Sequence, residues 1–419
     1  MICESIKDQY EVFEQIGVGS SSEVYLARST TTGCPVSIKK IAKIGPYITD
    51  NMNFDNYNNP VDSNRDVVNE VEIMKSIDHP FIVQFYELLE DNDNYYIVME
   101  SVENGSLLDN VNKNGVFDEQ KARKIFTQIV LAVKYLHDEK LIIHHDIKAE
   151  NILFDRNENI RLIDFGLSTV IHEVNNSVDN SVCGSAAYLA PEIILNIPHL
   201  FESDVWSLGV VLYAMTVGCL PFEDETIGGT VTKILHNEPE IPCYLSSDLS
   251  NLILAILTKD PTKRITLRGI LQHPWITNGK EYVNEVVLDQ FISMPIDSEI
   301  IESLHWFNIN SSILEEDLKE KKITPAVASY KAILREKNTD KLDEVTNDLF
   351  VNLSDDEIDF ICWPRKCIQP QTGKKNGFGL KNQAIVHSKK EFSPVIKTRY
   401  NQKRARICTT PDIPFAIVA

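Results

Sequence analysis

The chain has 419 residues, of which 43% are hydrophobic and 24% charged, as in a soluble globular protein of two or three domains. Its net charge of −20 disfavours specific nucleic-acid binding and favours basic peptides as partners, although an acidic surface can serve solubility alone. The eight cysteines form no CxxC pair or metal-ligand pattern, so we expect reduced thiols and a cytoplasmic or nuclear location. We expect no signal peptide and no transmembrane segment, because the longest apolar run is short and interrupted.

The N-terminal region predicts strands. Residues 8–41 alternate apolar and β-branched side chains between glycines, a pattern typical of a hairpin-rich sheet. Gly17 and Gly19 suit a loop around phosphate, because a residue without Cβ lets backbone N–H groups approach the oxygens. A GxG pair by itself is more often a turn. Ser22, in place of a third glycine, should loosen the approach without abolishing phosphate binding.

An asparagine-rich insertion follows at residues 43–64. It lacks periodic apolar positions, so we expect a flexible loop there rather than a partner site. The helical spacing of Val68, Val71 and Met74 then predicts a helix over residues 65–77. A strand pair, an amphipathic helix and a mainly helical region are expected after it.

The middle of the chain holds the segments HHDIKAEN, DFG and APE, in that order. Phosphoryl transfer needs a carboxylate on the attacking hydroxyl, cations on the phosphates and fixed geometry. Asp146 would act as the base, and Lys148 would steady the transferring phosphate. Asn151 and Asp164 would hold the magnesium ions that bridge the phosphate oxygens.

Motifs on both sides of these segments complete a family pattern. IGVGSSSEV, VSIK with Lys39 and a helix with Glu70 come before them, and DVWSLG, GCLPF and DPTKR come after. Together they resemble a eukaryotic serine/threonine protein kinase over residues 8–277, of the calcium/calmodulin-kinase-like class and close to the AMP-activated and microtubule-affinity-regulating kinases. The resemblance implies an α+β, bilobal fold with a β-rich small lobe, a helical large lobe, and ATP with Mg²⁺ between them.

The resemblance also assigns a nucleotide pocket. Lys39 and Glu70 would form the ion pair at the ATP phosphates. Met99 would limit the depth of the pocket, and residues 100–102 would form the hinge beside the adenine. Ser37 stands where the family usually has alanine, which suggests a modest effect on ATP affinity or inhibitor choice. The expected cofactor-binding residues are Ile16, Gly17, Gly19, Val24, Lys39, Glu70, Met99, Glu100, Val102, Leu153 and Asp164.

The acceptor class follows from the same resemblance. Lys148 and Ser185 match the serine/threonine pattern, so serine or threonine is the expected acceptor. Related basophilic kinases carry a glutamate just beyond the hinge to bind an arginine, and Ser106 stands there instead. Asp109 and Glu150 could still favour basic peptides, although solvated surface acids are an equal alternative.

One departure from the family pattern concerns control. His145 replaces the arginine that usually pairs with a phosphorylated activation loop, and Ser181 is the candidate site for an upstream kinase. A guanidinium suits a phosphate better than an imidazole does. We therefore expect activity to depend less on Ser181 phosphorylation, or to become mildly pH-sensitive through His145. The alternative is that His145 only keeps a local hydrogen bond.

The chain changes character after the catalytic region. Residues 286–337 contain three predicted helices, and Thr324 with Pro325 fits an N-cap and first-turn pair. They resemble the ubiquitin-associated-like (UBA-like) domain of the same kinases, which in that family docks on the catalytic domain and modulates it; a plain helical extension is the alternative. We expect residues 338–419 to be a mostly disordered tail, basic from residue 362. That tail could be an intramolecular tether, an anionic-lipid or nuclear-import patch, or have no role.

The pattern as a whole predicts an ATP:protein phosphotransferase acting on protein or peptide substrates in signalling. The alternative is a pseudokinase or scaffold, which only Ser22, Ser37 and His145 favour. Calcium/calmodulin control is disfavoured, because the region just after the catalytic domain is acidic where a basic amphipathic helix would be needed.

Overall fold

A computed structural model describes residues 4–19, 22–43, 63–171, 186–197, 200–278, 288, 292 and 295–348. All of them belong to one compact unit. Residues 44–62 of the predicted insertion, Ser181 with Ser185, and the tail from residue 349 lie outside the described residues. No helix in the described part of the chain is both long enough and apolar enough to cross a membrane.

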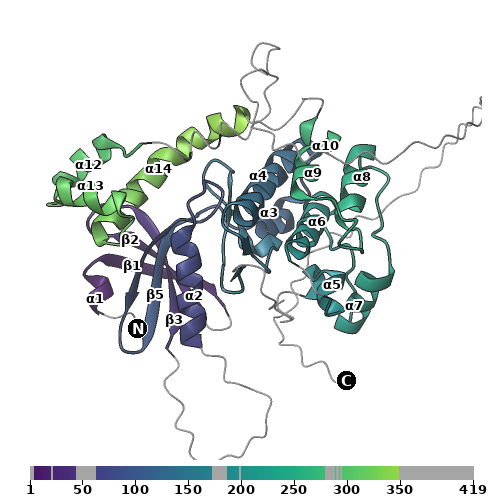
Figure 1. Ribbon diagram of the computed structural model, residues 1–419, viewed down its shortest axis with the longest axis horizontal. Coiled ribbons are helices and arrows are strands. Elements are labelled where there is room, and N and C mark those ends of the chain that lie inside the picture. Colours follow the sequence, from purple (N-terminus) through teal and green to yellow (C-terminus); the bar gives the residue numbers. More distant parts are fainter. Residues whose placement is uncertain are drawn as a thin grey trace, which may run out of the picture. The chain divides into compact units, whose positions relative to one another are not determined.

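The small lobe is built on a five-stranded antiparallel sheet in the order β1-β2-β3-β5-β4, as the alternating pattern predicts. The helix α2 lies beside this sheet (Figure 1) and contacts β4. The elements are α1 Glu4–Lys7, β1 Tyr10–Val18, β2 Ser22–Ser29, β3 Pro35–Ala42, α2 Ser63–Ser76, β4 Phe85–Glu90 and β5 Asn94–Glu100.

Helix α2 presents one face to the core. Val67, Val71 and Met74 are buried at helical spacing, and Glu70 is buried on the same side. Val68, which the sequence pattern placed on the apolar stripe, is 50% exposed instead. Val67 takes its place on the buried face, whereas Val71 and Met74 are buried as predicted.

The large lobe is mainly helical, and α6 lies at its centre between α4 and α8. Gly209 on α6 permits a close approach, because a Cβ there would lie 2.6 Å from Ile256 Cγ2 and 2.8 Å from Leu257 Cδ2. The elements are α3 Leu107–Asn114, α4 Glu119–Asp138, β6 Ile142–Ile143, η1 Ala149–Asn151, β7 Ile152–Phe154, β8 Ile160–Leu162, β9 Thr169–Val170, η2 Ala186–Tyr188, α5 Pro191–Ile194, α6 Glu202–Val217, α7 Ile227–His236, α8 Ser247–Ile256, α9 Leu267–Leu271 and α10 Pro274–Thr277.

A buried ion pair holds the APE segment, residues 190–192, in place within the large lobe. Arg264 Nη1 and Nη2 donate to the two carboxylate oxygens of Glu192 at 2.6 and 2.8 Å. Both side chains are almost fully buried. Removing one partner of such a pair is costly, because the other charge is left without compensation in a low-dielectric interior.

We expect Arg264→Ala to lower the free energy of unfolding by about 3–5 kcal/mol, the usual cost of breaking a buried pair. Lys263→Ala is the matched control, because the neighbouring Lys263 pairs with Asp260 on the surface with 76% of its side chain exposed. Urea unfolding of both variants checks this. Equal stability of the two variants would contradict it.

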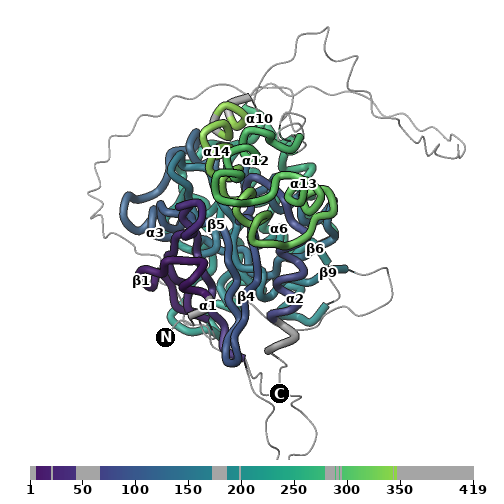
Figure 2. The backbone as a smooth tube through the Cα atoms, turned by 90° about the vertical axis from the view of Figure 1, so that its left-hand side faces the viewer, coloured from purple at the N-terminus to yellow at the C-terminus, as the bar shows by residue number. Residues whose placement is uncertain are grey.

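Three helices follow the large lobe, and Figure 2 shows them together in green: α12 Ser298–His305, α13 Ser311–Lys319 and α14 Pro325–Asp348. Thr324 Oγ1 accepts from Val327 N at 3.3 Å, so the predicted N-cap of α14 is confirmed. The helices share an apolar cluster of Ile300, Ile301, Leu304, Leu314, Val327 and Tyr330.

Helix α14 is longer than the sequence predicted. The expected helical block ended at residue 337, with the tail starting at residue 338, but α14 continues to Asp348. Leu342 is buried in the main core of the catalytic region, and Val345 packs against that core. The added turns are therefore stabilised by tertiary contacts. Helical propensity and sequence pattern do not reveal such contacts.

Candidate active site

The first cluster of the site joins Lys39, Glu70 and Asp164. Lys39 lies on β3, opposite Val24 of β2 and Ile97 of β5. Its Nζ lies 2.7 Å from Glu70 Oε1 on α2 and 3.1 Å from Asp164 Oδ1 beyond β8. The strand β3, the helix α2 and the segment that follows β8 thus meet at the ammonium group of Lys39.

Lys39 and Asp164 stabilise each other's charge in this cluster, whereas burial and the nearby Asp164 raise the pKa of Glu70. Burial alone would lower the pKa of the Lys39 ammonium, but the carboxylates of Glu70 and Asp164 outweigh it and raise that pKa. Burial alone would raise the pKa of Asp164, and the Lys39 charge overcomes this and lowers it. At neutral pH the cluster therefore offers a cation for phosphate and an ionised carboxylate for a metal ion.

The predicted glycine-rich loop begins within β1, at Gly17, and leads towards β2. Gly17 pairs with Val24, and Val24 pairs in turn with Lys39, so the three residues lie in a row across the sheet. Gly19 N donates to Ser22 O at 2.8 Å. A Cβ at Gly19 would lie 2.8 Å from Ser22 Oγ, so a larger residue would require that hydroxyl to move.

The remaining predicted pocket residues come from both lobes. Met99 lies opposite the buried Ser37, which shares a strand face with Lys39 because side chains alternate along β3. Ile16 is half exposed on β1. Glu100 ends β5 and Val102 follows it, whereas Leu153 belongs to β7 of the large lobe and forms an isolated bridge with Ser106.

The side chain of Glu100 has a partner set that the sequence did not indicate. It is buried and receives hydrogen bonds from Arg161 Nε at 2.7 Å, Arg335 Nε at 2.9 Å and Gln84 N at 3.1 Å. The predicted hinge residue is thus fixed by its carboxylate, from three separate segments of the chain.

The second cluster joins Asp146, Lys148 and Asn151. Lys148 Nζ lies 2.9 Å from Asp146 Oδ2. Asn151 Nδ2 donates to Asp146 O and to Asp146 Oδ2, both at 2.9 Å. The carboxylate of Asp146 is therefore held by an amide and an ammonium group.

The β7–β8 hairpin connects the two clusters. Ile152 pairs with Leu162, so Asn151 and Asp164 lie at the same end of the hairpin, and Ile163 N donates to Asn151 O at 2.9 Å. Two oxygen ligands on one hairpin end fit a magnesium site, because Mg²⁺ takes one or two protein oxygens and completes its shell with phosphate and water. The described residues hold no group of three or more His, Cys, Asp or Glu side chains that could bind a metal without such help.

The backbone before Asp146 is held by Asp204, on α6. Its carboxylate accepts from His144 N at 2.8 Å and His145 N at 2.9 Å, and it lies 2.8 Å from His137 Nε2. Burial would raise the pKa of Asp204, but the hydrogen bond with His137 and the charges of the neighbouring histidines lower it to about 2. His145 has a left-handed backbone with φ 65°, a strained conformation that Asp204 supports.

His145 itself makes a local contact. Its Nε2 lies 2.9 Å from Thr169 Oγ1 on β9. The sequence offered a local hydrogen bond as one explanation of this residue, and such a bond is present. Ser181, the other half of the regulatory hypothesis, lies outside the described residues.

A two-lobed fold with paired lysine and glutamate in one lobe and an aspartate–asparagine cluster in the other defines a class of phosphotransferase. The protein-family model described as "Protein kinase domain" matches residues 10–276 of this chain. The chain belongs to the protein kinase family.

Several known proteins are similar to it. SNF1-related protein kinase catalytic subunit alpha KIN12 of Arabidopsis thaliana is 35% identical over 83% of this chain and 67% of the relative. Sperm motility kinase 2B of Mus musculus is 32% identical over 80% of this chain and 66% of the relative. Serine/threonine-protein kinase SIK2 of Gallus gallus is 38% identical over 64% of this chain and 32% of the relative. The chain thus spans about two thirds of the length of the first two and about a third of the last, and these relatives agree with the expected AMP-activated group.

Proposed function

We propose that the chain phosphorylates serine or threonine hydroxyls of protein substrates with Mg-ATP. The observation that carries the proposal is the connection of the two clusters through the β7–β8 hairpin. The hairpin brings the phosphate-binding Lys39 and the candidate base Asp146 to one site through Asp164 and Asn151. The family match and the serine/threonine kinase among the relatives support the same activity.

Each side chain takes one role in this proposal. Lys39, oriented by Glu70, neutralises phosphate charge. Asp146 accepts the hydroxyl proton, and Asn151 and Lys148 hold its carboxylate in place. Asn151 and Asp164 would hold Mg²⁺, which supplies charge neutralisation at the phosphate oxygens when bound. The amide nitrogen of Asn151 is used by Asp146, so its amide oxygen is the atom that can bind the metal.

One of the two acidic residues that could favour basic peptides has a structural role instead. Asp109 Oδ2 accepts from Ser106 N at 3.0 Å and from Ser106 Oγ at 2.7 Å, so it forms the capping box of α3. That carboxylate is engaged in holding the helix start and is a poor candidate for binding a substrate arginine. Glu150 remains the proposed site of a basic preference.

We also propose that α12–α14 form the UBA-like domain. The alignment with the Arabidopsis relative covers 353 residues, which is more than the segment 10–276, so it includes residues outside the catalytic domain. A location in the cytoplasm or nucleus, an upstream kinase at Ser181 and lipid contact by the tail remain proposals.

The experiment that tests the function uses the full chain, Mg-ATP and an array of serine, threonine and tyrosine peptides. Phosphate should appear on serine or threonine and not on tyrosine. Nucleotide binding without transfer to any peptide would favour the pseudokinase or scaffold.

The Ser181→Ala variant tests the proposal about control. Because His145 is bonded to Thr169 and cannot offer a bidentate guanidinium, we expect this variant to keep at least about a third of parental kcat. His145→Arg should make kcat more dependent on Ser181. Steady-state kinetics of the single and double variants measure this, and complete loss of turnover in Ser181→Ala alone would refute it.

A further inference from the structure

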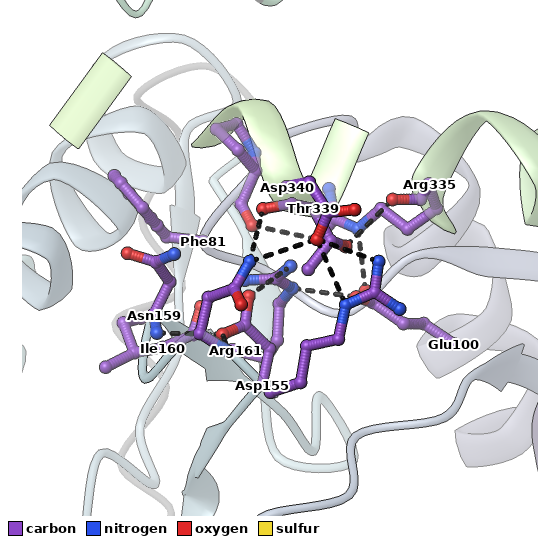
Figure 3. A network of polar contacts seen from close by, with 12 residues as sticks. Phe81, Glu100, Asp155, Asn159, Ile160, Arg161, Arg335, Thr339 and Asp340 are labelled. Carbon is purple, nitrogen blue, oxygen red and sulfur yellow. Dashed lines mark hydrogen bonds and ion pairs between the residues drawn. The ribbon is translucent and has the colours of Figure 1, made fainter. Parts of the chain in front are cut away.

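Helix α14 reaches the hinge as well as both lobes. Its first turns belong to the three-helix cluster, Ala328 and Ala332 also pack against the small lobe, and Leu342 enters the main core. Figure 3 shows where Arg335, Thr339 and Asp340 of α14 approach Glu100, Asp155 and Arg161. The helix therefore lies against the segment on which the two lobes pivot.

Arg335 is the residue of α14 that contacts the hinge. Only 13% of its side chain is exposed. Its Nε donates to Glu100 Oε2 at 2.9 Å, and Nη2 donates to Pro80 O at 2.9 Å and to Ile82 O at 2.6 Å. Nη1 donates to His79 O at 3.4 Å. One guanidinium thus joins the hinge to the carbonyls of the segment between α2 and β4.

Glu100 is held from the large lobe as well. Arg161 of β8 donates to Glu100 Oε1 at 2.7 Å, and its Nη2 lies 3.0 Å from Asp155. Arg161 is almost fully buried. The carboxylate of Glu100 thus receives one guanidinium from the large lobe and one from α14, and both are charge-assisted hydrogen bonds.

A second contact fixes α14 to the large lobe. Arg156, in the turn between β7 and β8, lies 2.8 Å from Glu336 and 3.0 Å from Asp340. Asn157 Nδ2 donates to Thr339 O at 3.1 Å. These exposed pairs contribute little stability each, but they set the position from which Arg335 reaches the hinge.

We propose that Arg335 is a positioning residue for ATP binding, acting through Glu100. The inference rests on the proposed nucleotide site. An adenine bound at residues 100–102 needs hinge backbone groups in fixed positions, and a hinge ordered before binding costs the nucleotide less free energy. Arg335 orders it by clamping the side chain of Glu100 and the carbonyls of residues 79, 80 and 82.

The test compares Arg335→Ala with Lys337→Ala in the full chain. Lys337 lies two residues along α14 and pairs with Asp297 and Glu299 at 2.8 Å, within the three-helix cluster. We expect Arg335→Ala to raise the dissociation constant and the KM for Mg-ATP about tenfold, equal to about 1.4 kcal/mol. Its kcat at saturating ATP should change less than about twofold. Lys337→Ala should bind Mg-ATP as the parent does.

Arg335→Lys covers the case in which the alanine variant does not fold. A lysine keeps the buried cation but cannot reach Glu100 and the carbonyls together, so we expect a rise of about threefold in the ATP dissociation constant. A lowered Tm with unchanged ATP binding would reduce Arg335 to a structural role and overturn the proposal. Tighter ATP binding or a higher kcat in Arg335→Ala would also overturn it, because α14 would then restrain the lobes. Absence of ATP binding in the parent would instead refute the proposed function itself.

Discussion

Replacing Asp146 with asparagine is expected to lower kcat by about 10²- to 10⁴-fold, the usual contribution of a general base. Asparagine has the shape of aspartate and keeps an oxygen for Lys148 and Asn151, which now hold the carboxylate at 2.9 Å. The fold and the ATP affinity should therefore be preserved while proton acceptance is lost. Steady-state kinetics with a peptide substrate, together with thermal unfolding, measure both effects.

Asp138→Asn is a suitable control for this experiment. Asp138 ends α4 and pairs with Lys134, with 58% of its side chain exposed. Its kcat should equal that of the parent. Retention of most activity by Asp146→Asn would show that another group accepts the proton and would invalidate the assigned mechanism.

The second large effect is expected for Lys39→Met. This substitution removes the cation that contacts Glu70 and Asp164 and leaves the buried Glu70 and the partly exposed Asp164 without their shared partner. Loss of one preorganised charge at a transferring phosphate costs about 10²- to 10³-fold in kcat. We expect a loss of that size or greater, with weaker ATP binding, and calorimetry with Mg-ATP beside a turnover assay separates the two.

Lys40→Met is the matched control, because the adjacent Lys40 points to the other strand face and pairs with Glu23. It should change kcat less than about twofold. Similar losses in the two variants would mean that the lysines act on the stability of β3 and not on phosphate.

The two clusters could be predicted from the sequence because most of their members lie in short segments. Asp146, Lys148 and Asn151 fall within six consecutive residues, so their spacing alone indicates one site. Lys39 and Glu70 were found by their motifs, and the structure brings them together at 2.7 Å. The strands of residues 10–42 followed from alternation, which is a local property of the chain.

The parts that the sequence did not predict depend on distant contacts. Arg335 is 235 residues from Glu100, and no local pattern links an arginine in a late helix to a hinge carboxylate. The extension of α14 to Asp348 depends on the core that receives Leu342. The support of His144 and His145 by Asp204 was missed for the same reason, since the DVWSLG motif does not reveal what its aspartate holds.

The central claim is that Asp146, Lys148 and Asn151 act with Lys39 and Asp164 as one phosphotransfer site. The most direct measurement follows transfer of the γ-phosphate of labelled Mg-ATP to serine or threonine peptides by the full chain and by Asp146→Asn at equal concentration. We predict transfer by the parent and at least about a hundredfold less by the variant, with equal ATP binding. Equal transfer by the two proteins, or none by a parent that binds ATP, would contradict the claim.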